Sequence, residues 1–144
     1  MEWSGTRGFG SEERMQTGKP IIVLVDDSAA MRAFFEQVAA EADLIFHAYD
    51  SAEESMSFLG SRQPGLLFLN VMMPNRDGYS FLKELRRHAL HASTPTVMIS
   101  SKDYAQDRTA ARELGVLEFV AKPISKKAIR SLLAKYLSTG NGAR

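Results

Sequence analysis

The chain has 144 residues, of which 44% are hydrophobic and 24% charged, as expected for one folded domain and unlike a disordered or fibrous chain. Its net charge of +1 gives no general attraction for nucleic acid or an anionic membrane. The absence of cysteine excludes disulfide bonds, a thiolate nucleophile and Cys-ligated zinc, and no apolar run reaches the roughly 18 residues of a membrane helix.

The first 18 residues are rich in Gly, Ser and charged side chains and show no hydrophobic period, which predicts a flexible tail without an export signal. The last residues, 139–144, are interpreted in the same way. One folded domain is therefore predicted over residues 19–138.

Five short apolar runs alternate with segments of helical period through this domain. Each run has the composition of a strand buried on both faces, and the runs cover residues 21–25, 44–49, 66–69, 96–100 and 116–120. Between them, apolar residues recur at intervals of three and four, as in Phe34, Phe35 and Val38. Ser28 and Ser51 are predicted N-caps, and Gly115 follows a predicted helix end.

Strict alternation of strands and helices predicts an α/β fold, in which a parallel sheet is covered by helices on both faces. In such a sheet the functional crevice lies at the carboxyl ends of the strands. The residues at those ends are polar: Asp26, Asp27, Asn70, Ser100, Ser101 and Lys122. The two carboxylates can bind a hard cation such as Mg²⁺, while the ammonium and the hydroxyls can contact an anion.

Four motifs at these strand ends resemble those of the receiver domain of two-component response regulators, the CheY-like superfamily. They are IIVLVDD, LLFLNVMMPNRDGY, TPTVMISSKD and GVLEFVAKP, in the expected order along residues 20–138. The resemblance implies a flavodoxin-like (βα)5 three-layer sandwich with a parallel sheet of order 2-1-3-4-5.

Carried over position by position, the resemblance implies a metal site and a phosphoryl site. Asp26, Asp27 and the backbone carbonyl of Met72 match the Mg²⁺ ligands. Ser100, Ser101 and Lys122 match the positions that contact the phosphoryl group. Ser100 and Phe119 match the two switch positions, which respond to phosphorylation.

Asn70 departs from the family pattern because it stands where receivers have the phospho-accepting Asp. An amide oxygen is neutral and is a poor nucleophile, so we expect no acyl phosphate at Asn70. As a metal ligand Asn70 is expected to be weak, and Mg²⁺ is expected to bind weakly because one anionic ligand is missing. Two explanations stay open: a natural receiver-like module that signals without phosphorylation, or an ordinary receiver with an inactivating Asp-to-Asn substitution.

The function expected from these residues is signalling through protein contacts, not enzymatic catalysis. Protein partners, a sensor kinase or a downstream effector, are expected across residues 103–135. We expect no binding to nucleic acid or membrane, a monomer or weak dimer, and a cytoplasmic location. The alternative from another class is a Mg²⁺-dependent phosphotransferase or phosphohydrolase, with Asp26 as nucleophile and Asp27 as acid or base.

Two further groups of side chains are interpreted as structural. Met72, Met73 and Met98 are predicted to fill gaps in the core. His47, His88 and His91 show no ligand spacing, and surface or partly buried positions are predicted for them.

Overall fold

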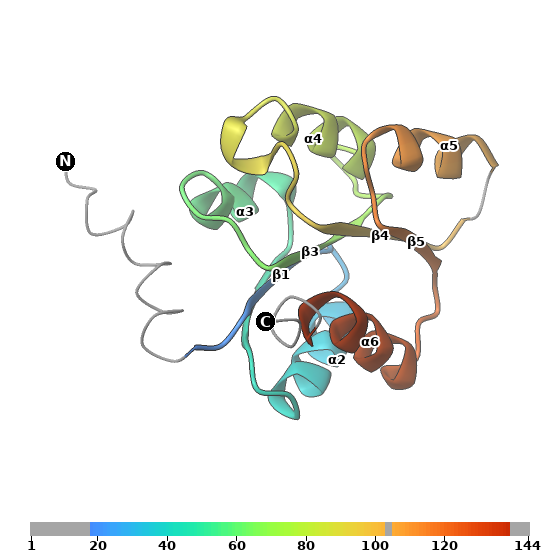
Figure 1. Cartoon of the computed structure of the whole chain (residues 1–144). Helices are drawn as coiled ribbons and strands as arrows, with labels where there is room; N and C mark the ends of the chain where they lie inside the picture. Colours follow the sequence, from blue (N-terminus) through green and yellow to red (C-terminus); the bar gives the residue numbers. More distant parts are fainter. Residues whose placement is uncertain (1–17, 103–104, 139–144) are drawn as a thin grey trace.

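The computed structural model describes residues 18–102 and 105–138 (Figure 1). The predicted flexible tails, apart from Gly18, lie outside the described residues, as do residues 103 and 104.

Five parallel strands form one sheet in the order β2-β1-β3-β4-β5, which confirms the predicted topology (Figure 1). The strands are β1 (Ile21–Val25), β2 (Ile45–Tyr49), β3 (Leu66–Asn70), β4 (Thr96–Ser100) and β5 (Glu118–Ala121). The last strand begins two residues later than predicted. Val116 still belongs to the preceding helix end, because its N–H donates to the carbonyl of Ala111 after Gly115 turns the chain with a φ of +75°.

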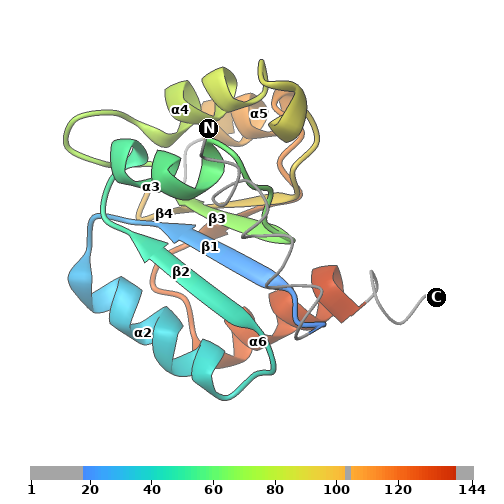
Figure 2. The same ribbon diagram turned by 90° about the vertical axis from the view of Figure 1, so that its left-hand side faces the viewer.

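Helices cover both faces of the sheet, with α3 (Ala52–Leu59), α4 (Gly78–Leu85) and α5 (Ala105–Glu113) on one face and α2 (Ala29–Ala40) and α6 (Lys126–Leu133) on the other (Figures 1 and 2). A short 3-10 helix, η1 (Ala89–His91), precedes β4, and a π-helical turn, η2 (Ala134–Ser138), extends α6. The predicted caps are confirmed, since Ser28 accepts a hydrogen bond from the Met31 N–H and Ser51 from the Glu54 N–H.

The sheet separates two hydrophobic clusters. Leu67 and Leu69 of β3 belong to the cluster under α3, α4 and α5, whereas Leu66 and Phe68 belong to the cluster under α2 and α6. This arrangement follows from the period of two in a strand, which sends successive side chains to opposite faces. Because both faces are covered, β1, β3 and β4 are buried along their whole length.

The methionines follow the prediction only in part. Met98 is buried and Met73 packs against the first cluster, as expected of core side chains. Met72 is different, with 49% of its surface exposed, because it lies in the loop after β3 and not in the strand. Its contribution to the site is through its backbone carbonyl.

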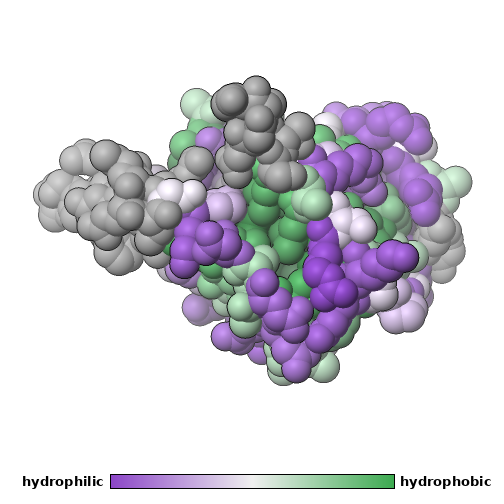
Figure 3. All heavy atoms as spheres, turned by 60° about the horizontal axis from the view of Figure 1, so that its bottom comes forward, coloured by the Kyte–Doolittle hydropathy of each residue, from purple (hydrophilic) through white to green (hydrophobic). Residues whose placement is uncertain are grey.

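The outer face of α2 and α6 is largely hydrophilic, with a hydrophobic strip open near its centre (Figure 3). Part of the polar cover is an ion-pair cluster in which Glu41, after α2, lies 3.5 Å from Lys126 and 3.3 Å from Arg130 of α6. Within the described residues, no helix has both the length and the apolar character needed to cross a membrane.

Candidate functional site

The predicted site residues come from the carboxyl ends of four neighbouring strands. Asp26 directly follows β1, Asn70 ends β3, Ser100 ends β4 and Lys122 directly follows β5. The strand register aligns these ends, since Asn70 pairs with Ile99 of β4, and Ser100 with Ala121 of β5. Because the strands are parallel, the polar groups gather at one edge of the sheet.

Asp26 and Lys122 form an ion pair beneath this edge. The Asp26 side chain is 0% exposed, and its Oδ2 lies 3.1 Å from the Nζ of Lys122, which is 18% exposed. The other oxygen, Oδ1, accepts a hydrogen bond of 2.9 Å from the Ser28 N–H at the start of α2. Arg32 of α2 donates to the backbone carbonyl of Asp26 at 2.9 Å. A buried carboxylate needs such partners, since an unpaired one would be strongly destabilising.

Asn70 lies 3% exposed between two loops. Its side-chain Nδ2 donates to the carbonyl oxygen of Met72 at 2.8 Å and to Oδ1 of Asp27 at 3.2 Å. Asp27 is itself exposed to solvent. Both acceptors lack a proton to donate, so the NH₂ group of the amide has to face them. One side chain thereby joins the loop after β1 to the loop after β3.

Ser100 is also buried in the site, at 1% exposed. Its Oγ accepts a hydrogen bond of 3.1 Å from the Lys102 N–H, and its carbonyl accepts one of 2.7 Å from the Lys122 N–H. Ser101 is exposed at the rim. The structure therefore places Ser100 in a buried position at the end of β4, the strand next to that of Asn70, and Ser101 in an exposed position directly after it.

Phe119 lies on edge strand β5, which is separated from the strand of Asn70 by β4. It is half-buried and packs against the cluster under α3, α4 and α5. The guanidinium of Arg108 in α5 lies 5.1 Å from the centroid of its ring, within the range of a cation–π contact. Phe119 thus connects β5 with α5 on the outer edge of the molecule.

The side-chain oxygens of Asp26 and Asp27 and the Met72 carbonyl oxygen, here called the oxygen cluster, are of the types that bind a hard divalent cation. Their arrangement does not suit one. Oδ1 of Asp26 accepts from the Ser28 N–H, and its Oδ2 has the Lys122 ammonium beside it without a hydrogen bond. Oδ1 of Asp27 and the Met72 carbonyl both accept from Asn70. In the described part of the chain, no group of three or more His, Cys, Asp or Glu side chains could hold a metal ion.

A cleft of about 310 Å³ borders the site on the side of α3. Acidic side chains dominate it, among them Asp27, Asp50 and Glu53, and Arg76 lines it from the loop before α4. Arg76 forms an ion pair with Glu84 of α4. The cleft next to Asp27 therefore carries more negative than positive charge.

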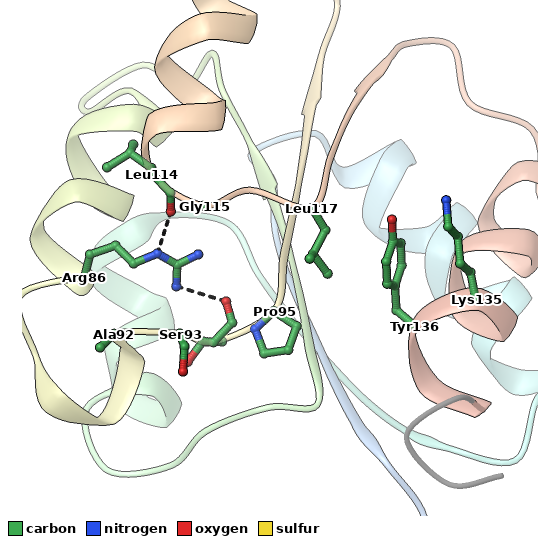
Figure 4. A pocket seen from close by; sticks show the side chains of 10 residues that line it. Arg86, Ala92, Ser93, Pro95, Leu114, Gly115, Leu117, Lys135 and Tyr136 are labelled. Atoms are coloured by element: carbon green, nitrogen blue, oxygen red, sulfur yellow. Dashed lines mark hydrogen bonds between the residues drawn. The ribbon is translucent and has the colours of Figure 1, made fainter. Parts of the chain in front are cut away.

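A second concavity, of about 580 Å³, lies at the opposite end of the strands (Figure 4). Arg86 forms one wall, and Tyr136 and Lys135 lie across from it, with Leu117 and Pro95 between them. Arg86 donates to the carbonyls of Leu114 at 2.8 Å and of His91 and Thr94 at 2.9 Å each. Burial lowers the pKa of Arg86.

Three charged or polar groups join β5 to the end of α6 at this concavity. Oε2 of Glu118 accepts hydrogen bonds from Lys135 Nζ at 2.8 Å and from the Tyr136 hydroxyl at 2.6 Å. These two hydrogen bonds lower the pKa of Glu118, and the one to Glu118 raises the pKa of Lys135. The contacts stabilise the π-helical turn against the edge strand.

Several hydrogen-bonding roles were not predicted from the sequence: those of Arg32, Arg86 and His91, and the helix-capping role of Asp77. Only Asp77 carries a usable signal, since an Asp three residues before Ser80 and directly before an apolar helix is a typical N-cap. Arg86 contacts the carbonyl of Leu114 and His91 that of Leu59, and both partners are distant in sequence. Arg32 contacts the carbonyl of Asp26, six residues earlier, and no residue pattern indicates this contact. His91 is 1% exposed, so the predicted surface or partly buried position is wrong for this residue.

The chain matches the family model described as the response regulator receiver domain over residues 22–134. Among curated relatives, a probable transcriptional regulator ycf27 from Cyanophora paradoxa is 32% identical over 125 residues, which cover 84% of this chain and 51% of the relative. The chain spans about half the length of this relative and of the other ycf27 proteins it matches.

Solved structures of similar fold include chemotaxis protein CheY4 of Vibrio cholerae, with a TM-score of 0.77 and 18% identity, covering 83% of this chain and 99% of that one. The Mn²⁺-bound form of response regulator Rcp1 has a TM-score of 0.75 and 23% identity, covering 83% of this chain and 96% of that one. At these identities the likeness shows the fold.

Proposed function

The chain belongs to the response regulator receiver domain family of two-component signalling, and we propose that it signals through protein contacts without being phosphorylated at the usual position. The observation that carries this proposal is Asn70. It ends β3, is 3% exposed, and directs its amide nitrogen toward Asp27 and Met72.

Asn70 lacks the property that an acceptor needs, which is an anionic oxygen able to attack phosphorus. An amide oxygen is neutral, and the amide nitrogen shares its lone pair with the carbonyl. Support for the rest of the predicted phosphoryl site comes from the neighbouring strand ends, where Ser100 is buried at the end of β4 and Lys122 pairs with Asp26. The absence of phosphorylation in this proposal therefore depends on one side chain.

A divalent cation is expected to bind weakly in this pocket. Asp26 and Asp27 supply two negative charges and Lys122 one positive charge, whereas an acidic residue at position 70 would supply a third negative charge. A smaller net negative charge lowers the affinity for a hard cation. The Mn²⁺-bound form of Rcp1 shows that a protein of this fold holds such an ion.

The surface proposed for protein partners runs over α5, β5 and α6, within residues 103–135. Phe119 lies half-buried on β5, the second of these three elements along the chain. Many of the basic side chains on this surface already have acidic partners within the chain: Lys126 and Arg130 pair with Glu41, and Lys135 pairs with Glu118. A partner would therefore meet a surface of mixed charge around an aromatic side chain, and not a purely basic helix.

The alternative phosphotransferase or phosphohydrolase has no support from the family match. Its proposed nucleophile, Asp26, is 0% exposed and is held by the Ser28 N–H and the Lys122 ammonium. A carboxylate in these contacts is poorly placed to attack a substrate from solvent.

Incubation with acetyl phosphate and Mg²⁺, followed by intact mass measurement, tests the proposal on this chain and on its Asn70→Asp variant. We expect the unsubstituted chain to keep its mass and the variant to gain one phosphoryl group, because the substitution restores an anionic oxygen beside Ser100 and Lys122. Stable incorporation of phosphoryl groups into the unsubstituted chain would contradict the proposal. Such a result would place the acceptor elsewhere, with Asp27 the first residue to examine.

A further inference from the structure

We infer that the Asn70 amide takes the place of a divalent cation in this pocket, so that the loops after β1 and β3 are joined without a metal ion. This inference rests on the proposed function, because it explains how the pocket is held when no phosphorylation occurs. It goes beyond weak metal affinity caused by a missing charge, since it assigns the loss to competition from a specific hydrogen-bond donor.

Two oxygens of the pocket accept hydrogen bonds from the Asn70 amide. Oδ1 of Asp27 and the carbonyl oxygen of Met72 are the oxygens that a cation would have to share in order to join the loops after β1 and β3. Both lie within hydrogen-bond distance of one nitrogen, at 3.2 and 2.8 Å. The two hydrogens of the Asn70 NH₂ group therefore make the same connection between the loops that a cation would make.

Displacing the Asn70 amide from these two acceptors costs free energy. Asn70 is 3% exposed, so its NH₂ group cannot turn to solvent when it gives up these acceptors. A buried donor left without a partner costs about 1–3 kcal/mol. A cation that entered between Asp27 and Met72 would have to supply this free energy in addition to its own dehydration.

The remaining carboxylate of the pocket belongs to Asp26. Asp26 already has a cation beside it, since its Oδ1 accepts from Ser28 and its Oδ2, which has no hydrogen-bond partner among the described residues, forms an ion pair with Lys122 at 3.1 Å. A metal ion would therefore compete with the Lys122 ammonium for this carboxylate. Of the four oxygens named here, three accept hydrogen bonds from nitrogen, and the fourth, Oδ2 of Asp26, is balanced by the Lys122 ammonium. These contacts hold the two loops together without a metal ion.

Competition from the amide and a missing negative charge predict different Mg²⁺ affinities for one variant. Asn70→Ala has the same net charge as the unsubstituted chain but no donor facing Asp27 and Met72. If the amide competes with the cation, Asn70→Ala binds Mg²⁺ at least about threefold more tightly than the unsubstituted chain, and Asn70→Asp at least about tenfold more tightly. If only charge matters, Asn70→Ala and the unsubstituted chain bind equally.

Mg²⁺ titration followed by NMR of ¹⁵N-labelled protein measures these affinities, with Mn²⁺ line broadening as a second probe of the same site. A measurement on the unsubstituted chain alone guards against poor folding of the alanine variant. Its Asn70 side-chain NH₂ signals should stay unchanged at millimolar Mg²⁺, because the amide keeps both acceptors. Shifts of these signals at that concentration, or equal affinities of the unsubstituted and alanine proteins, would overturn the inference.

The phosphorylation proposal has a separate outcome. Unsubstituted protein that binds Mg²⁺ readily but gains no mass with acetyl phosphate would refute the inference and leave the proposed function standing. Unsubstituted protein that is phosphorylated would refute the proposed function, whatever its Mg²⁺ affinity.

Discussion

At the scale of single residues, Asn70 shows how one atom can reverse the polarity of a contact. A carboxylate at this position would turn lone pairs toward the Met72 carbonyl and toward Asp27, where the amide instead donates at 2.8 and 3.2 Å. Repulsion between such acceptors is what a bound cation would otherwise relieve. The same shape therefore supports two different sites, one with a metal ion and one with an internal donor.

His91 is a second residue whose role depends on its surroundings. Its ring is buried, with Nε2 lying 2.6 Å from the carbonyl oxygen of Leu59 and Nδ1 lying 2.8 Å from Oγ1 of Thr94. Because a carbonyl only accepts, Nε2 carries the proton in the neutral ring. Burial lowers the pKa of His91, opposed by the Leu59 hydrogen bond and reinforced by the nearby charges of His88 and Arg86.

This pKa predicts that stability decreases in mild acid. The unfolded chain binds a proton on His91 near the ordinary value of 6.5, whereas the folded chain resists it to a lower pH, so the free energy of unfolding falls as the pH drops below about 6.5. Urea unfolding between pH 8 and pH 5 measures the slope. His91→Gln should flatten it, whereas His88→Gln removes only one neighbouring charge and should change the slope much less. An equal slope in the His91 variant would contradict this origin.

At the scale of elements, the start of α4 is closely fitted to the end of β3. Asp77 caps the helix by accepting a hydrogen bond of 2.8 Å from the Ser80 N–H, and Gly78 donates one of 2.8 Å to the Val71 carbonyl. A Cβ on Gly78 would lie 2.5 Å from the backbone oxygen of Asn70. Glycine is therefore required for the helix to approach the strand that carries the site.

Gly78→Ala should destabilise the protein by at least about 2 kcal/mol, because the clash is with backbone atoms that cannot move independently. Gly65→Ala is the control, since its Cβ would lie 3.4 Å from a flexible Leu137 methyl group and should change stability by less than about 1 kcal/mol. Thermal or urea unfolding measures both. Equal effects of the two substitutions would show that the close approach at Gly78 is not limiting.

The helix α5 is the least buried of the five. Only Ala111 among its residues is buried, so hydrogen bonds carry much of its attachment. The Tyr79 hydroxyl of α4 donates to the Asp107 carbonyl at 2.8 Å, and Arg86 donates to the Leu114 carbonyl just after the helix. Burial and the charge of Asp107 raise the pKa of Tyr79, which keeps this hydroxyl protonated as a donor.

Tyr79→Phe removes one of these attachments while keeping the ring. We expect faster amide hydrogen exchange in α5, with a change of about 1 kcal/mol or less in global stability, because one hydrogen bond of this kind contributes about that much. Tyr49→Phe in β2, at the other edge of the sheet, is the control. Unchanged exchange in α5 would show that this helix is held by other contacts.

At the scale of the whole molecule, the sheet is shared by two separate hydrophobic clusters. Leu66 and Leu67 are neighbours in β3, are both 0% exposed, and face opposite clusters. Loss of either cluster would leave one face of the same sheet open to water. The two faces should therefore unfold together.

Leu66→Ala and Leu67→Ala are each expected to lower the free energy of unfolding by about 2–5 kcal/mol, as typical for a leucine truncated in a packed core. Each variant should still unfold in one transition that near- and far-ultraviolet circular dichroism report together. Two separate transitions in either variant would show instead that the faces are independently stable.

Much of the fold could be predicted because its signals are local. Burial on both faces makes β1, β3 and β4 continuous apolar runs, and the caps at Ser28 and Ser51 act within three residues. The start of β5 was misplaced because Val116 is apolar but is engaged by the preceding helix end through Ala111. A run of apolar letters cannot show which carbonyl a backbone N–H will meet.

By itself, the sequence determined the alternation of strands and helices, the sheet order implied by the family resemblance, and the polar residues placed at the strand ends. Only the tertiary structure decided the direction of the contacts among them. That the Asn70 nitrogen faces Asp27 and Met72, and that Lys122 meets Asp26 at 3.1 Å, depends on loops brought together from residues far apart in the chain. Hydrogen bonds require distance and direction, and neither is encoded in residue type or spacing alone.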